Sequence, residues 1–179
     1  MSARPRLIAV DGANGRALLA VAQRMAPTNG AVGISRWDDS GLFEQLIMAG
    51  DDISTASPRL LLLLYAADLA FRLRWEIEPA LAEGRQVVAA PYTDTALAFG
   101  RACGLPAKWL NGLFRFARRP SERHLVGAPA ARSRMASGFV EFGCARLAQL
   151  DGRALATRTR RYLSVRGGSG QRRRRRRSR

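Results

Sequence analysis

The residues best suited to chemistry in this chain form a short turn near the N-terminus, between the apolar run Leu7–Val10 and an Ala/Leu-rich run that extends to Met25. A glycine turn between a strand and a helix can hold a phosphate, because the first backbone N–H groups of a helix are unpaired and its dipole attracts anions. An ordinary strand–turn–helix without a ligand would show the same pattern. On the first interpretation, the residues that bind the phosphates of a nucleotide are Asp11, Gly12, Asn14, Gly15 and Arg16.

This turn departs from a working Walker A loop at the positions that handle charge. The motif G-x-x-x-x-G-K-[ST] uses its Lys on the β and γ phosphates and its hydroxyl on Mg²⁺. Counted from Gly12, the second glycine is Ala17, the Lys is Leu18 and the Ser/Thr is Leu19. Arg16 is the only cation nearby in the sequence, and it could replace the Lys in part only if the loop shifted its register.

Strands and helices must alternate along the chain to position such a turn. Short apolar runs predict strands at Leu7–Val10, Ala31–Ser35, Gln86–Ala90 and His124–Gly127. The predicted helices are Arg16–Met25, Gly41–Ala49, Arg59–Glu78, Thr95–Cys103, Ala107–Arg118 and Arg134–Gln149. This alternation indicates an α/β fold in which helices flank both faces of a parallel sheet. Ligands bind such sheets at the carboxyl ends of the strands. We therefore expect the loops Asp11–Arg16, Arg36–Gly41 and Pro91–Asp94 to meet at one edge.

The composition argues against several classes of protein. No run approaches the roughly 18 apolar residues that a membrane span needs, so no membrane association is expected. Cys103 and Cys144 have neither metal-ligand spacing nor a disulfide framework. We therefore expect a reducing, cytoplasmic location and no metal centre held by cysteines.

The positive charge of the chain is concentrated at its C-terminus. The formal net charge of the chain is +16. Residues 152–179 contain 12 arginines and no acidic residue and so carry +12, which leaves +4 for residues 1–151. Gly167–Gly170 is predicted to be a flexible linker, which divides a folded domain, residues 1–165, from a disordered tail, residues 166–179. Such a tail can bind nucleic acid or another polyanion without sequence preference, or it can be a by-product of GC-rich coding or of a shifted reading frame. The residues that would bind the polyanion are Arg172, Arg173, Arg174, Arg175, Arg176 and Arg177.

Four landmarks between residues 7 and 105 give the chain a resemblance to the thymidylate kinase family. Leu62–Ala70 followed by Ile77–Leu81 resembles the family's L-L-x-x-A-A-D-R-A … I-x-P-A-L helix. Gly84–Thr95 resembles G-x-x-V-x-x-D-R-Y-x-D-S, Ser35-Arg36 stands where T-R-E-P-G-G-T begins, and Asp11–Gly15 resembles the start of the phosphate loop.

The resemblance implies a P-loop NTPase-like fold and the reaction ATP + dTMP → ADP + dTDP, a step of dTDP biosynthesis that uses Mg²⁺. It also implies a homodimer and binding of the monophosphate by Arg36, Tyr92 and Asp94. Each of these residues has a simpler interpretation as well. Arg36 can be a solvated loop charge, Tyr92 a core aromatic residue, and Asp94 the N-cap of the helix that begins at Thr95.

The departures from the family fall on phosphate-handling positions. Besides Leu18 and Leu19, the Asp-Arg before the tyrosine is Ala90-Pro91, and an Arg that contacts the monophosphate is Leu69. Met48 replaces a further Arg, and Trp37-Asp38-Asp39-Ser40 replaces E-P-G-G. Because phosphoryl transfer depends on electrostatic stabilisation, we predict a pseudokinase with weak or no activity. Only Arg16 and Asp94 remain as catalytic candidates. The alternative is a non-enzymatic protein that binds a polyanion or another protein, reuses the kinase scaffold and needs no cofactor.

Beyond Leu105 the family expects a strand, an Arg-bearing lid, a final strand and a final helix. Arg132 and Arg134 are candidate remnants of the lid. Leu150–Leu163 is the candidate for the last helix, with Asp151 as its predicted N-cap. His124, the only histidine, is predicted to be a buried polar residue without a catalytic role.

Overall fold

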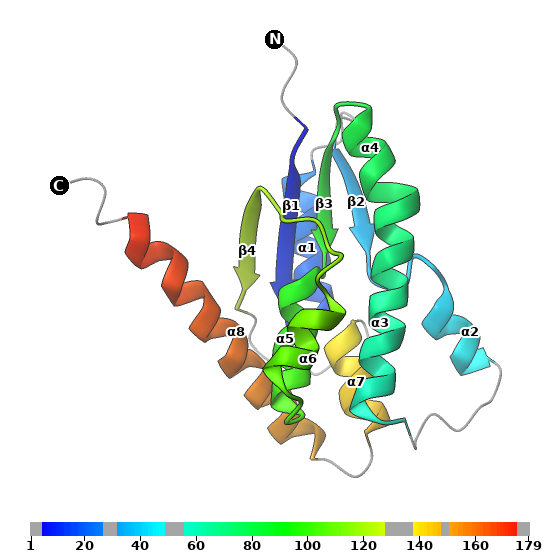
Figure 1. The fold of residues 1–179 in the computed structure, drawn as a ribbon, viewed down its shortest axis with the longest axis vertical. Coiled ribbons are helices and arrows are strands. Elements are labelled where there is room, and N and C mark those ends of the chain that lie inside the picture. Colours follow the sequence, from blue (N-terminus) through cyan, green and yellow to red (C-terminus); the bar gives the residue numbers. More distant parts are fainter. Residues whose placement is uncertain (1–4, 27–31, 49–55, 128–137, 148–150, 175–179) are drawn as a thin grey trace.

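The computed structural model describes residues 5–26, 32–48, 56–127, 138–147 and 151–174. These residues contain a four-stranded sheet in the order β2-β3-β1-β4 (Figure 1). Every neighbouring pair of strands is parallel, which confirms the predicted α/β architecture. The strands are β1 (Leu7–Gly12), β2 (Val32–Arg36), β3 (Gln86–Ala90) and β4 (Glu122–Val126).

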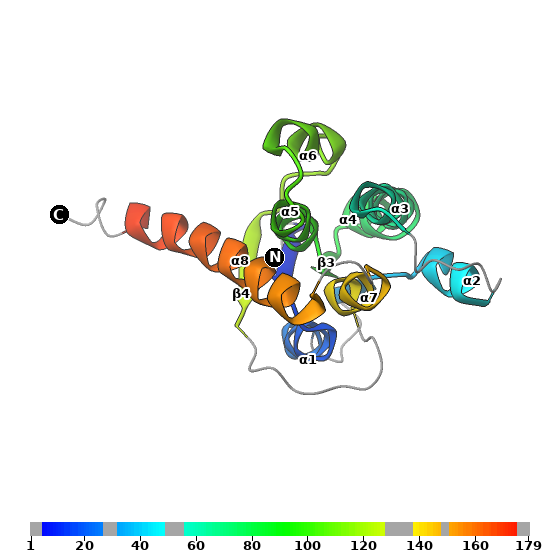
Figure 2. The ribbon, with the colours of Figure 1, turned by 90° about the horizontal axis from the view of Figure 1, so that it is seen from below.

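Helices cover both faces of this sheet, as the sequence predicts. Figure 2 shows α1 on one side and α3, α5 and α6 on the other. Because side chains alternate along a strand, β1 supplies both layers: Ile8 packs with Leu18 of α1, whereas Leu7 belongs to the larger core on the opposite face. The α-helices are α1 (Gly15–Met25), α2 (Leu42–Met48), α3 (Pro58–Arg72), α4 (Glu78–Ala82), α5 (Thr93–Ala102), α6 (Ala107–Leu113), α7 (Phe139–Arg146) and α8 (Gly152–Arg174).

The long helix predicted over residues 59–78 changes its hydrogen bonding partway. After α3, the π-helical segment η2 (Leu73–Ile77) leads into α4, and Glu78 N–H bonds to the carbonyl of Leu73 five residues earlier. Pro79 follows at once and has no N–H to donate to the carbonyl of Trp75. Gly84 then ends the element with a φ of +80°, as its predicted C-cap role requires.

Three other predictions about the middle of the chain need correction. Helix α5 begins at Thr93, so Asp94 lies in its first turn and is not its N-cap. Helix α6 ends at Leu113, earlier than predicted. His124 lies on edge strand β4, where its side chain is 40% exposed and faces Glu122, so it is not a buried residue.

The C-terminal part begins as predicted and then differs. Asp151 Oδ1 accepts hydrogen bonds from the N–H groups of Arg153 and Ala154, which confirms it as the cap of α8. Helix α8 continues to Arg174 and so passes through Gly167–Gly170, where we expected a linker. No strand follows β4 within the described ranges, and the lid candidates Arg132 and Arg134 lie outside those ranges. The division at residue 165 stays a prediction.

Among the described residues, no helix is long and apolar enough to cross a membrane. Cys103 and Cys144 are free thiols. Burial raises the pKa of Cys103 to about 12 and that of Cys144 to about 11, so both are poor nucleophiles at neutral pH.

Candidate nucleotide site at the carboxyl edge of the sheet

The three loops expected to meet do so at the carboxyl edge of the sheet. Ala89 of β3 lies beside Ser35 of β2 on one side and beside Ala9 of β1 on the other, so these three strands end at a similar level. A cavity of about 360 Å³ opens there, within the usual size range of small-molecule sites. Its walls are formed by Gly15, Leu18, Leu19, Arg36, Trp37, Asp38, Asp39, Ala90, Pro91 and Gly138.

Asp11 joins two of these loops. Its buried Oδ1 accepts hydrogen bonds from the backbone N–H of Tyr92 at 2.9 Å, the N–H of Thr95 at 2.9 Å and the hydroxyl of Thr95 at 2.8 Å. The Thr95 oxygen in turn accepts from Gly12 N–H at 3.0 Å. Burial, together with the nearby Asp94 carboxylate, raises the pKa of Asp11 from 3.8 to about 6. Asp11 therefore positions the loop after β1 and is not on the cavity wall.

The start of α1 is capped by the residue that precedes it, Asn14, and by Glu141 from a distant part of the chain. Asn14 Oδ1 accepts the N–H of Ala17 at 2.9 Å, an ordinary N-cap. Glu141 of α7 then places its carboxylate over the same helix end. Its Oε1 accepts from Asn14 Nδ2 at 2.9 Å, and its Oε2 accepts from Gly15 N–H at 3.2 Å.

The chain also approaches this helix end closely at Gly138. A Cβ atom at that position would lie 2.8 Å from the Cα of Gly15, so only glycine fits there without a shift of the backbone. Together, Gly138 and Glu141 hold α7 against the turn in which we predicted a phosphate. A carboxylate of the protein thus contacts the helix end at which we predicted an anion.

Arg36 and the loop after β2 carry compensating charges. Arg36 Nη2 lies 3.4 Å from Asp39 Oδ1, and its backbone N–H donates to Asp39 Oδ2 at 2.6 Å. Asp38, with a φ of +63°, accepts the N–H groups of Phe43 and Glu44 and so caps α2. Burial raises the pKa of Asp38 above its usual value. Arg36 remains on the cavity wall, but with an acidic partner.

A second cavity, of about 430 Å³, lies on the other side of the turn. Its walls are formed by the turn after β1, by the end of β4 and by α8. Arg160 and Arg161 of α8 bring positive charge to its wall, close to Asn14. Arg16 lines neither of these two cavities. It is exposed, and its side chain makes no ion pair or hydrogen bond with any other described residue.

No family model matches the chain. A probable thymidylate kinase of Pyrobaculum calidifontis is 31% identical over 107 residues, 58% of this chain and 54% of the relative. A probable thymidylate kinase of Pyrococcus horikoshii is 35% identical over 92 residues, 51% and 43% of the two chains. A probable thymidylate kinase of Thermococcus gammatolerans is 41% identical over 71 residues, which are 40% of this chain and 34% of the relative.

These sequence matches support the thymidylate kinase family. The crystal structure of a thymidylate kinase from Ehrlichia chaffeensis aligns with a TM-score of 0.66 at 13% identity, over 93% of this chain and 86% of that chain, and so supports the P-loop NTPase fold. The chain matches about half or less of the length of these curated relatives.

The remaining predicted site residues lie away from the first cavity. Tyr92 is buried, and its hydroxyl donates to the carbonyl of Arg118 at 2.7 Å. Asp94 is nearly buried and pairs with Arg123 at 2.8 Å. Of the three residues that the family resemblance assigns to the monophosphate, the cavity wall includes only Arg36.

The positions where the family places charge are filled by apolar side chains on the cavity wall. Leu18 and Leu19 stand where the family has Lys and Ser/Thr, and Ala90 and Pro91 stand where it has Asp-Arg. One buried donor on the same wall, Trp37 Nε1, has no hydrogen-bond partner among the described residues.

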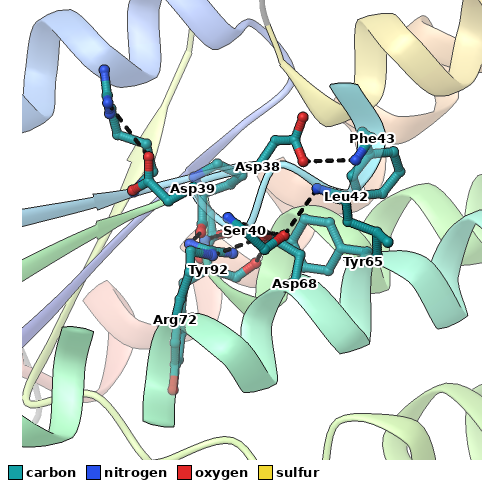
Figure 3. A network of polar contacts seen from close by, with 12 residues as sticks. Asp38, Asp39, Ser40, Leu42, Phe43, Tyr65, Asp68, Arg72 and Tyr92 are labelled. Carbon is teal, nitrogen blue, oxygen red and sulfur yellow. Dashed lines mark hydrogen bonds and ion pairs between the residues drawn. The ribbon is translucent and has the colours of Figure 1, made fainter. Parts of the chain in front are cut away.

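Sequence reasoning did not identify the buried ion pair behind this wall (Figure 3). Arg72 Nε donates to Asp68 Oδ2 at 2.9 Å, and both side chains are fully buried. Arg72 Nη1 also donates to the carbonyl of Pro91 at 3.0 Å, and Ser40 Oγ donates to Asp68 Oδ1 at 2.8 Å. The pair thus connects α3 to the loops after β2 and β3. The only signal in the sequence was the i, i+4 spacing of an acid and a base.

Proposed function

We propose that this chain is a thymidylate kinase-like protein that binds nucleotide weakly and has little or no kinase activity. The observation that carries the proposal is the Glu141 carboxylate on the first N–H of α1. A kinase uses that helix end to stabilise phosphates, whereas here it already holds an anion.

The charge balance of the site supports the same conclusion. Phosphoryl transfer requires cations and dipoles around the transferred group. The cavity wall offers Arg36 as its only Lys or Arg among the described residues, and Arg36 is paired with Asp39. A phosphate about 4 Å from Glu141 would be opposed by about 4 kcal/mol at an effective dielectric constant of about 20.

Mg²⁺ does not fit the described residues at this edge. The position that should supply the hydroxyl ligand is Leu19, and Asp11 already accepts three hydrogen bonds through one oxygen. No group of three or more His, Cys, Asp or Glu side chains within the described ranges could hold a metal ion. We therefore assign no catalytic step to Mg²⁺ or to ATP. If the chain is active, the family reaction is ATP + dTMP → ADP + dTDP.

A coupled assay for ADP production from ATP and dTMP, with Mg²⁺ present, tests this proposal. Turnover should lie far below the about 1–100 s⁻¹ of ordinary kinases. Calorimetric titration with dTMP and with ATP should detect weak binding at most. Turnover in the ordinary range would contradict the proposal, and Arg16→Ala would then show whether Arg16 replaces the missing Lys.

A second candidate function is binding of nucleic acid or another polyanion. It rests on the 12 arginines of residues 152–179 and on the exposed Arg153, Arg158 and Arg161 of α8. In this proposal residues 1–165 form the folded scaffold, and Arg172–Arg177 make the main contacts with phosphates.

We also propose a homodimer and a cytoplasmic location. An apolar stripe on α3 and η2 is exposed to solvent and would suit a second copy of the chain. It is formed by Leu60 (45% exposed), Leu63 (50%), Phe71 (39%) and Trp75 (65%). The location rests on the cysteine pattern of the sequence.

A further inference from the structure

We propose a phosphate-binding site in an arginine-lined hollow that is separate from the loop after β1. The hollow has a volume of about 250 Å³ and lies among α5, α6, the segment between α6 and β4, and β4 itself. Four arginines line it: Arg115, Arg118, Arg119 and Arg123. Neither the family resemblance nor the proposed kinase site assigns a role to this place.

The positive charge of the hollow exceeds what its acidic neighbours offset. Arg118 pairs with Glu78 at 2.7 Å, and Arg123 pairs with Asp94 at 2.8 Å. The side chains of Arg115 and Arg119 make no ion pair or hydrogen bond with any other residue that the structure describes. Four cations gathered with two acidic partners repel one another, and a bound anion would relieve that repulsion.

The ion pairs already present would not prevent an anion from binding. The side chain of Arg118 is 52% exposed and that of Arg123 47% exposed. An exposed pair such as Arg118–Glu78 typically contributes about 0–1 kcal/mol, so a phosphate can compete for the Arg118 guanidinium. The Asp94 side chain is only 6% exposed, so Arg123 keeps this partner and offers a phosphate its remaining N–H donors. Glu78 is itself 45% exposed and can be solvated once released.

The arginines, and not the end of the neighbouring helix α5, supply the attraction. The N–H of Thr95 at the start of α5 already donates to Asp11 Oδ1, and Asp94 adds a carboxylate to the same turn. Guanidinium groups also match the geometry of phosphate oxygens, because they donate two parallel hydrogen bonds.

The size of the hollow indicates how much of a ligand it can hold. Its volume is below the about 300–1,000 Å³ of typical small-molecule pockets, so it suits a phosphate group rather than a whole nucleotide. Phe116, 46% exposed in the segment that carries three of these arginines, offers a surface on which an attached base could stack. The ligand is thus a phosphate, either free or as part of a single-stranded nucleic acid.

Site-resolved protection from an arginine reagent tests this proposal on the full chain. The protein is modified with phenylglyoxal, and each arginine is followed by peptide mass spectrometry. The additions are inorganic phosphate, short oligo-dT, or sodium chloride at the same ionic strength. Arg24, exposed on α1 on the other face of the sheet, is the internal control. At a ligand concentration about ten times Kd, modification of Arg115 and Arg119 should slow about ten-fold.

The possible outcomes distinguish free phosphate from a nucleic-acid backbone as the ligand, or contradict the proposed site. Protection of Arg115 and Arg119 by phosphate supports a free-anion site, and protection by oligo-dT alone supports a nucleic-acid backbone. Protection no greater than that of Arg24 overturns the proposal. In Arg115→Gln/Arg119→Gln, protection of Arg118 and Arg123 should also be lost, whereas Arg24→Gln should retain it.

Discussion

At Gly15, the backbone N–H that would meet a phosphate donates to Glu141 Oε2, 3.2 Å away. Asn14 Nδ2 completes the contact with the other carboxylate oxygen at 2.9 Å. A carboxylate at a helix N-terminus is stabilising through the same dipole that attracts phosphate. The contact therefore satisfies the donors of this turn in a chain that has Leu18 at the position of the Walker A lysine.

Replacing Glu141 with Ala should destabilise the protein and create an anion site. Asn14 Nδ2 and Gly15 N–H would lose their acceptor, at a cost of about 1–3 kcal/mol in unfolding free energy. Inorganic phosphate should then raise the melting temperature of Glu141→Ala more than that of the wild type, in thermal unfolding against sodium chloride of equal ionic strength. Glu44→Ala, an exposed change on α2, serves as the control. An equal response of Glu141→Ala and wild type to phosphate would contradict this prediction.

A second residue-scale prediction concerns Asp11, whose pKa is about 6 in the folded state and 3.8 in the reference state. Below pH 3.8 Asp11 is protonated in both the folded and unfolded states. As the pH rises, the unfolded chain ionises first, so the contribution of Asp11 to stability is lost by about pH 6. The loss is at most about 3 kcal/mol.

The variant Asp11→Asn keeps an oxygen acceptor and removes the charge. At pH 7 this variant should be at least as stable as the wild type. Between about pH 4 and pH 6 its free energy of unfolding should lack the part of the decline that Asp11 causes in the wild type. Urea unfolding measured across that pH range tests both expectations. Asp11→Ala loses three hydrogen bonds and should be less stable at every pH. A pH dependence of Asp11→Asn identical to that of the wild type would show that Asp11 does not titrate there.

Sequence reasoning identified the turn but not its acidic occupant. Asn14 and Glu141 are 127 residues apart, and no local pattern reports such a contact. Asp94 was assigned as a cap because it precedes Thr95, but the helix begins two residues earlier and Asp94 pairs with Arg123 on β4. Short-range chemistry could be predicted, whereas side-chain pairs between distant segments could not.

At the scale of elements, alternating apolar runs were sufficient to predict the strands and the parallel sheet. The boundaries of α5, α6 and α7 were less well predicted, because tertiary contacts decide where those helices end. The π-helical segment η2 was not predicted, although Pro79 follows it directly. Its geometry places Trp75 in solvent, at 65% exposure, on the same stripe as Leu63 of α3.

The apolar stripe of α3 and η2 gives an element-scale prediction. If a second copy of the chain packs on it, Leu63→Glu should convert a dimer into a monomer, because a charge would be buried in an apolar interface. Light scattering coupled to size-exclusion chromatography measures this mass. Leu63 is already 50% exposed, so the variant should remain folded. Gln23→Glu on α1, an exposed change on the other face of the sheet, should leave the mass unchanged. A monomeric wild type would contradict the proposed homodimer.

For the molecule as a whole, residues 1–151 carry +4 and residues 152–179 carry +12, so nucleic-acid affinity should reside mainly at the C-terminus. About six phosphate contacts from Arg172–Arg177 would give a slope of log K against log[salt] of about −4 to −5. Deleting Gln171–Arg179 should remove most of this binding, measured by fluorescence anisotropy with random oligonucleotides at two salt concentrations. Replacing the six arginines with glutamine, at unchanged length, should have the same effect and leave the melting temperature unchanged.

Equal affinity of the full-length and shortened chains would instead locate the basic surface in the residues that precede Gln171. An absence of salt-sensitive binding in both would mean that the arginine run does not bind nucleic acid.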